Sequence, residues 1–121
     1  MRDRAYDSIP YQASQIEHRY GPNVHILANP FLLGHLATLC AKDTRQPAIN
    51  NLVRLLYQDL LRTVIAAEFP RRRVAAPTRM IDSSPQAFFE GEVVDRDVRA
   101  FTVNIARAGA VPSQEAYDLL N

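Results

Sequence analysis

Cysteine and long apolar runs are both scarce in this sequence. Cys40 is the only cysteine, so the chain can form no intramolecular disulfide and a reducing compartment is expected. No segment approaches the ~20 consecutive apolar residues that span a bilayer, and the N-terminal residues lack the apolar stretch of a signal peptide. The sequence therefore predicts a soluble, cytoplasmic protein.

An excess of charge of one sign is also missing. The 14 Lys and Arg residues oppose 13 Asp and Glu residues, which leaves a net charge of +1. Such a balance gives no overall field to attract nucleic acid or an anionic membrane. The arginines at 71–73 have no interleaved aromatic residues and are expected at a solvated corner. We expect neither a nucleic-acid partner nor a membrane partner.

The composition that remains predicts one folded domain without a metal site of its own. The 121 residues are 47% hydrophobic and 22% charged, which are ordinary values for a globular domain. His18, His25 and His35 do not have the spacing of metal ligands, and no acidic residue joins them at helical spacing. These histidines are expected to be structural or to lie on the surface.

Helical periodicity dominates residues 23–70, which follow an arm at 1–22. The arm mixes charges, tyrosines and prolines, and it is expected to contain a short helix at 13–19. A first helix should run to Ala41, with Asn29 as its N-cap and Pro30 in its first turn.

The longest periodic segment predicts a second helix between Pro47 and Pro70, with Asp43 or Thr44 as its cap. Its apolar face consists of Ile49, Leu52, Val53, Leu56, Leu60 and Val64. This face could pack against the rest of the chain or against a partner.

Strand-like patterns replace the helical period after Pro70. Residues 71–97 predict a hairpin region, with the hairpin itself around 74–94. Residues 98–105 predict a strand that is apolar enough to be covered on both faces. No parallel neighbour for this strand is visible, so the chain is typical of the front part of a larger α/β fold.

The last element completes a βα unit at 98–121. A helix is expected from about Pro112, with Ser113 as its cap and Glu115 in its first turn. Gly109 would occupy a left-handed position in the preceding turn.

Three stretches, in this order, resemble the uracil phosphoribosyltransferase family. The stretch NPFLLGHLATLCAKDT is similar to the family's N-terminal signature, in which Pro30, Leu36, Leu39, Lys42 and Thr44 keep the pattern. The helix NNLVRLLYQDLLRTVIAAEFP and the following VAAP are similar to the family's next helix and strand start. The ending VNIARAGAVPSQEAYDLLN resembles the family's Pro-Ile-Leu-Arg-Ala-Gly-Leu turn and the helix after it. The resemblance implies an α/β fold of the type I phosphoribosyltransferase kind, represented by its N-terminal helical arm, β-hairpin and first βα unit.

The resemblance also implies a site. In the family the turn contacts the pyrophosphate of phosphoribosyl pyrophosphate (PRPP), which Mg²⁺ bridges. The matching residues here are Ala106, Arg107, Ala108 and Gly109. Arg79 is a weaker counterpart of a phosphate contact in the family's mobile segment, and no catalytic residue is assigned. Dimer contacts are implied for the helix face led by Leu52, Leu56 and Leu60.

Parts of the family pattern are missing. Asn29, Cys40 and Ala41 stand where the family has His, Arg and Asp. Asp95 and Asp97 are not followed by the Thr-Gly pair of the family's PRPP loop, and the segment that reads uracil has no counterpart. We therefore expect a single truncated domain, 1–121, that is not active alone.

Three hypotheses stay open at this point. The chain could be one component of a uracil phosphoribosyltransferase-like enzyme, with the PRPP loop and base pocket supplied by a second chain or by a homo-oligomer. It could instead be a non-catalytic interaction or regulatory subunit that pairs with a full-length phosphoribosyltransferase. It could also be a fragment without function, in which case the strand at 98–105 would be left with exposed edges and the chain would aggregate.

Overall fold

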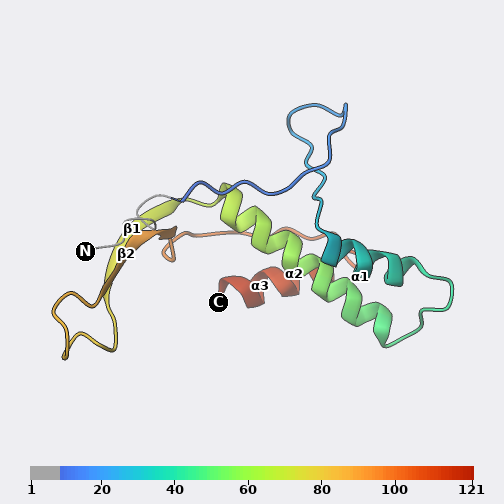
Figure 1. Cartoon of the computed structure of the whole chain (residues 1–121). Coiled ribbons are helices and arrows are strands. Elements are labelled where there is room, and N and C mark those ends of the chain that lie inside the picture. Colours follow the sequence, from blue (N-terminus) through green and yellow to red (C-terminus); the bar gives the residue numbers. More distant parts are fainter. Residues whose placement is uncertain (1–8) are drawn as a thin grey trace. The chain divides into compact units, whose positions relative to one another are not determined.

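A computed structural model describes residues 9–121, and residues 1–8 of the expected arm lie outside the described part (Figure 1). The described elements are α1 (Pro30–Cys40), α2 (Ala48–Glu68), β1 (Arg71–Pro77), β2 (Phe88–Val94) and α3 (Ala110–Leu120). The strands form one two-stranded antiparallel sheet. The predicted α/β class is confirmed at the level of a mixed protein with helices and an antiparallel hairpin.

The chain divides into two compact units that interleave along the sequence. The hairpin unit contains residues 9–11 and Ile65–Arg99, and the helical unit contains Gln12–Val64 and Ala100–Asn121. The sequence alone predicts one domain with successive regions instead. Each unit therefore joins segments that are far apart in the chain.

The predicted hairpin is present in the hairpin unit. The residues paired at its two ends are Arg71 with Val94 and Pro77 with Phe88. It begins earlier than the 74–94 predicted, because the arginines at 71–73 belong to β1. Residues 78–87 connect the strands as a loop of turns.

The arginines are therefore not at a corner, and they have partners inside the unit. The Arg72 guanidinium lies 2.7 Å from Asp97 Oδ2 and 3.7 Å from Asp95 Oδ1. Both aspartates follow the end of β2, and ion pairs as exposed as these contribute about 0–1 kcal/mol each. Asp95 and Asp97 thus neutralise Arg72, which is a structural role.

Arg71 links the hairpin to the backbone of two neighbouring segments. Its guanidinium donates hydrogen bonds to Ile9 O at 2.8 Å and to Ala66 O at 3.2 Å, and it lies 4.0 Å from Glu92 Oε1. A planar guanidinium can bind several acceptors at once because it has five N–H donors. Arg71 thus holds together three segments of the hairpin unit.

In the helical unit, α1 begins as predicted. Asn29 has extended backbone, and its Oδ1 accepts hydrogen bonds from Phe31 N–H at 3.0 Å and Leu32 N–H at 3.4 Å. Pro30 fits the first helical position because the N–H that it lacks would have no partner inside the helix. The predicted Asn-Pro helix start is therefore confirmed.

The N-terminal contact of α2 comes from Gln46, not from Asp43 or Thr44 as predicted. Gln46 Oε1 accepts a hydrogen bond from Asn50 N–H at 3.2 Å, and Gln46 Nε2 donates to Asn50 Oδ1 at 3.1 Å. Thr44 donates its hydroxyl to Thr38 O at the end of α1 instead. The predicted cap is wrong because Thr44 closes the preceding helix.

The predicted short helix at 13–19 is also wrong. Ile16 N–H donates to Ile26 O at 2.9 Å, and Ala28 N–H donates to Ser14 O at 2.8 Å. These antiparallel contacts use the backbone groups that a helix would need, so the segment is extended.

α3 begins at Ala110, earlier than the predicted Pro112. Pro112 is tolerated because the first turn of a helix does not use its N–H groups. Ser113 is not the cap; its N–H donates to Gly109 O at 3.1 Å, and Gly109 is the N-cap residue. Glu115 consequently lies beyond the first turn.

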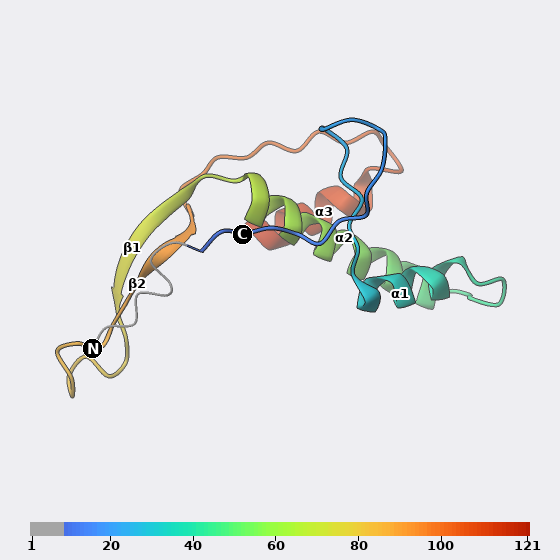
Figure 2. The same cartoon turned by 45° about the horizontal axis from the view of Figure 1, so that its top comes forward.

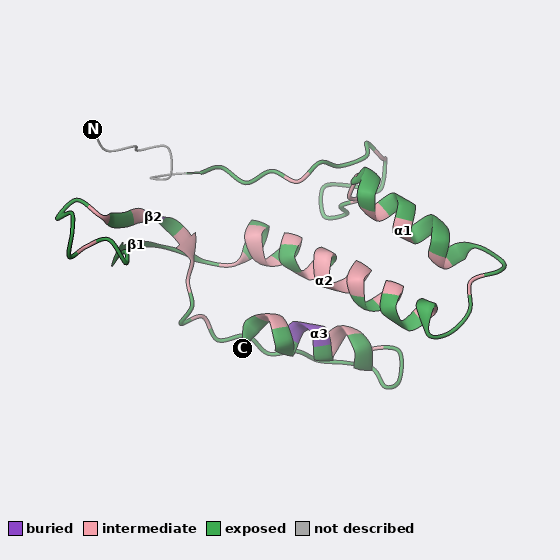
Figure 3. Cartoon of the chain, turned by 60° about the horizontal axis from the view of Figure 1, so that its bottom comes forward, coloured by how far each residue is buried: buried purple, intermediate pink, exposed green. Residues whose placement is uncertain are grey.

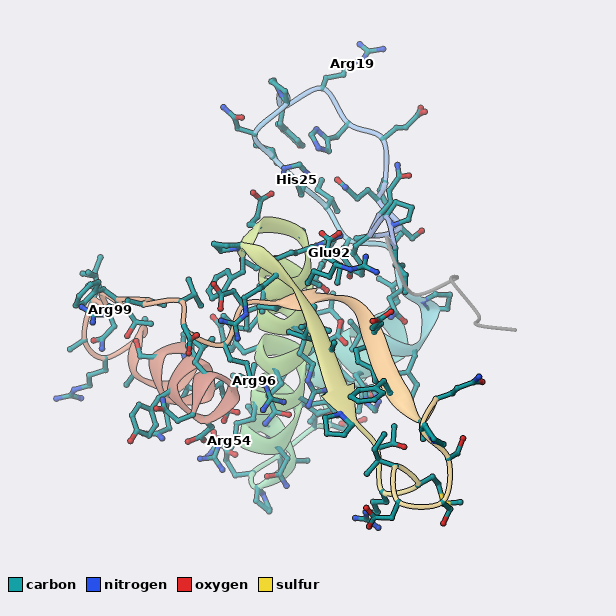
Figure 4. The ribbon with its side chains drawn as sticks, turned by 90° about the vertical axis from the view of Figure 1, so that its left-hand side faces the viewer. Arg19, His25, Arg54, Glu92, Arg96 and Arg99 are labelled. Carbon is teal, nitrogen blue, oxygen red and sulfur yellow. The ribbon has the colours of Figure 1, made fainter. Side chains whose placement is uncertain are left out.

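Glu115 connects α3 to α2, and the two helices lie side by side (Figures 1 and 2). Gln58 Nε2 donates a hydrogen bond to Glu115 Oε2 at 2.7 Å, and Arg54 Nε lies 3.3 Å from Glu115 Oε1. The Glu115 side chain is only 4% exposed, whereas that of Arg54, which Figure 4 labels, is 59% exposed. A buried carboxylate is costly unless it is paired and hydrogen-bonded, and both conditions are met here.

Little of either unit is buried. Among residues 9–121, only Gly91, Glu115 and Ala116 are buried, and one side of α2 is half-buried (Figure 3). No helix in this part of the chain is long and apolar enough to cross a membrane.

Residues 98–105 do not form the predicted strand. The segment is extended, but no described residue pairs with its backbone as a neighbouring strand. The side chains of Phe101, Val103 and Ile105 are 92%, 96% and 83% exposed. The prediction is wrong because a strand requires a partner and the described chain provides none.

Candidate functional site

The turn at 106–109 joins this extended segment to α3. Gly109 N–H donates to Ile105 O at 2.8 Å and Ala110 N–H donates to Arg107 O at 3.1 Å, which closes the turn. The peptide bond between Ala106 and Arg107 is cis. The expected site residues Ala106, Arg107, Ala108 and Gly109 are thus contiguous at the N-terminus of a helix.

Gly109 is required at this position for steric reasons. A Cβ atom on Gly109 would lie 2.6 Å from Asn104 Cβ, 2.8 Å from Ile105 N and 3.0 Å from Ile105 O. Its φ of −79° is available to any residue, so the predicted left-handed conformation is wrong. The close approach of α3 to the preceding backbone, not the dihedral angle, selects glycine here.

Arg107 and the backbone around it form a group of donors. The Arg107 side chain is exposed, and within the described structure its guanidinium has no hydrogen bond or ion pair. The N–H groups of Ala108 and Val111 likewise have no acceptor among residues 9–121. A helix N-terminus carries about half a positive charge. Together these groups are suited to binding an anion, and a guanidinium can bind two phosphate oxygens at once.

Arg79 does not belong to this group in the structure. It lies in the loop of the hairpin unit and is exposed, whereas Arg107 lies in the helical unit. The two phosphate contacts implied by the resemblance therefore come from different units. Arg79 remains a prediction.

The predicted interface leucines share one side of α2. Leu52, Leu56 and Leu60 follow one another at intervals of four residues, which places them on one face of a helix. Leu52 and Leu56 are half-buried and Leu60 is 44% exposed. Part of this face is thus available to a partner, and the interface remains a prediction.

The described residues offer donors for an anion but no ligand set for Mg²⁺. No group of three or more His, Cys, Asp or Glu side chains converges within residues 9–121. His18 is engaged locally, since its Nδ1 accepts from Tyr20 N–H at 3.1 Å and its Nε2 lies 2.7 Å from Val24 O. Mg²⁺ that accompanies a phosphate substrate is commonly held by the phosphates, by waters and by only one or two carboxylates, so the Mg²⁺ implied by the resemblance remains a prediction.

The contact of Glu115 with Arg54 and Gln58 was not predicted from the sequence. Glu115 lies in a helix that also presents exposed polar residues, so its position alone does not mark it as buried. The one available signal was helical spacing, because Arg54 and Gln58 are four residues apart and face the same way.

Comparison of the chain with protein-family models, curated proteins and solved structures finds no match. The geometry of the turn and the exposed segment before it are therefore the basis of the proposals that follow.

Proposed function

We propose that the chain is one component of a uracil phosphoribosyltransferase-like enzyme, corresponding to the N-terminal part of a type I phosphoribosyltransferase fold. In this proposal the turn at 106–109 binds the pyrophosphate of PRPP. The phosphoribosyl group is transferred to a uracil-like base, and a second chain contributes the PRPP loop and the base pocket.

The donors at the turn support this role. Pyrophosphate leaves with growing negative charge, and donors that are fixed in place before the reaction stabilise such charge without reorganisation. Arg107 contributes an exposed guanidinium, and Ala108 and Val111 contribute N–H groups without acceptors among the described residues. The chain itself would thus bind and orient the leaving group.

The single observation that carries the proposal is the steric need for Gly109 beside an exposed Arg107. Ile105 backbone atoms lie 2.8 and 3.0 Å from the place a Cβ would take. Such close backbone packing at a helix N-terminus fixes the position of the free N–H groups, which is what an anion site needs. The exposed Arg107 guanidinium lies beside these N–H groups in the sequence and can contribute a positive charge to the same anion.

The test is the Arg107→Ala variant in the complex purified from the protein's own cells. Formation of the nucleotide from uracil and PRPP in the presence of Mg²⁺ would be measured. We expect about a 10²–10³-fold loss of turnover, as for removal of one donor from a preorganised anion site. Arg45→Ala is the matched control because Arg45 is exposed in the same unit and its side chain has no partner among the described residues.

Two results would contradict the proposal. If the complex forms no nucleotide with uracil or related bases, the proposed activity is wrong. If the complex is active but Arg107→Ala and Arg45→Ala have the same turnover, the proposed role of the turn is wrong.

A non-catalytic interaction subunit is the second candidate, and the exposed segment at 101–105 favours it. Three apolar side chains at alternate positions, each more than four-fifths exposed, favour binding to another protein whether or not chemistry occurs. For this candidate, Arg107→Ala should leave the activity of the assembled complex unchanged.

A further inference from the structure

The most unusual surface of the protein is the extended segment at residues 101–105, FTVNI. Its apolar side chains alternate with Thr102 and Asn104, so in an extended chain they share one face. Phe101, Val103 and Ile105 are all more than four-fifths exposed. Together they expose on the order of 400 Å² of apolar surface. The largest apolar patch on a soluble monomer is typically about 300–600 Å², and it is often an interaction site.

The backbone of the segment is also unsatisfied. From Arg99 to Asn104, no backbone N–H or C=O forms a hydrogen bond with any described residue. An unpaired row of donors and acceptors is a template for pairing with another strand. The segment therefore offers both main-chain and side-chain contacts to the same occupant.

The charges around the segment argue against a second copy as that occupant. Residues 98–114 contain Arg99 and Arg107 but no acidic residue (Figure 4 labels Arg99). In an antiparallel self-pair centred on Val103, Arg99 of each copy would lie at the end of the other segment that leads into the turn with Arg107, so that positive charges would gather at both ends of the pair. Like charges placed opposite each other destabilise strand pairing. A strand with acidic residues near its ends would instead be attracted.

The area involved suits a stable complex. A standard protein interface buries about 800 Å² on each partner. The three apolar side chains provide roughly half of this, and the backbone and flanking side chains can provide the remainder. A strand from another protein could thus bury an area of the size found in stable complexes.

We propose that residues 101–105 are a docking strand that pairs with a strand of a second, different polypeptide. That strand has apolar side chains at alternate positions and acidic residues near its ends. The pairing covers Phe101, Val103 and Ile105 and satisfies the free backbone groups. The inference rests on the proposed function only in requiring a second chain, and it needs no PRPP chemistry.

The test compares the free chain with the complex isolated from the protein's own cells through a tag on this chain. Native mass spectrometry gives the stoichiometry, and amide hydrogen exchange gives the protection of each segment. In the free chain we expect the amides of residues 101–105 to exchange without protection. In the complex we expect exchange at least about 100-fold slower there.

Variants locate the contact. Val103→Glu places a charge in the centre of the apolar face and should lower recovery of the second chain at least about tenfold. Thr102→Glu is the matched control, because Thr102 is exposed and in a paired strand it would point to the face opposite Val103, so this variant should retain the complex. Arg99→Glu should weaken binding and make it less sensitive to salt. Because Val103 is exposed, unchanged circular dichroism of the free Val103→Glu chain will show that the fold is intact.

Four outcomes would overturn the inference: a homodimer, no stoichiometric second chain, a bound second chain that leaves the 101–105 amides unprotected, or Val103→Glu binding as well as wild type. The result is also separable from the proposed function. If the 101–105 amides are protected in the complex but the complex transfers no phosphoribosyl group, the docking strand is supported and the proposed function is wrong. If the complex transfers the phosphoribosyl group but these amides stay unprotected, the proposed function is supported and the docking strand is wrong.

Discussion

Replacing Glu115 with alanine should release α3 from α2. The change removes the hydrogen bond from Gln58 at 2.7 Å and the ion pair with Arg54 at 3.3 Å. A hydrogen bond to a charged group contributes about 1.5–3 kcal/mol. The Arg54 contact adds no more than ~1 kcal/mol, because the 59% exposed arginine remains screened by water. We expect the docking free energy of α3 to fall by about 2–4 kcal/mol.

Release of α3 should be visible as lost helix. Isolated helices shorter than about 12–15 residues are marginal in water, and α3 has 11 residues. α1 also has 11 and α2 has 21, so about a quarter of the helical signal in circular dichroism should disappear. Amide exchange in α3 should become fast at the same time.

Two further variants serve as controls. Glu115→Gln keeps the size of the side chain and an acceptor for Gln58, so it should cost only about 1 kcal/mol. Gln114→Ala removes an exposed contact with Asp118 on the same helix and should cost less than about 0.5 kcal/mol. If Glu115→Ala kept the full helical signal and protected α3 amides, our interpretation of this contact would be wrong.

Two predictions concern backbone positions. Gly109→Ala should break the hydrogen bond to Ile105 O, at a cost of about 1 kcal/mol, and should speed amide exchange at position 109. Gly34→Ala in α1 should instead raise the free energy of unfolding by about 0.5–1 kcal/mol, because nothing lies within 4 Å of the new Cβ. If the two variants had equal effects on amide exchange and on urea unfolding, the steric interpretation would be wrong. Asn29→Ala should lower the stability of α1 by about 1 kcal/mol and fray its first turn, measurable as faster exchange at Phe31 and Leu32, and unchanged exchange there would show that the side-chain cap contributes nothing.

Local signals in the sequence were sufficient to identify α1 and α2. Asn29 followed by Pro30 determines where α1 starts, and the apolar period ending before Pro70 identifies α2. Both signals act within a few residues, so no knowledge of distant contacts is needed. The hairpin was predictable for the same reason, because its strands are close in sequence.

Contacts between distant segments were not predictable. Residues 13–19 have acceptable helix formers, yet pairing with residues 26–28 makes them extended. The burial of Glu115 depends on Gln58, which is 57 residues away in sequence. The sequence predicts that α3 starts near Pro112, because proline favours the first turn of a helix, whereas the close packing at Gly109 allows the helix to begin at Ala110. At the candidate site, the sequence indicated which residues belong to the turn but not the steric reason for Gly109.

The exposed segment at 101–105 should affect how long the protein survives in a cell. Chaperones and proteases recognise extended, apolar chain that is accessible to water, and this segment is accessible without any unfolding. A newly made copy would therefore be subject to quality control from the moment it folds. If a second chain covers the segment as proposed, the abundance of the protein would follow the supply of that chain rather than the rate of its own synthesis.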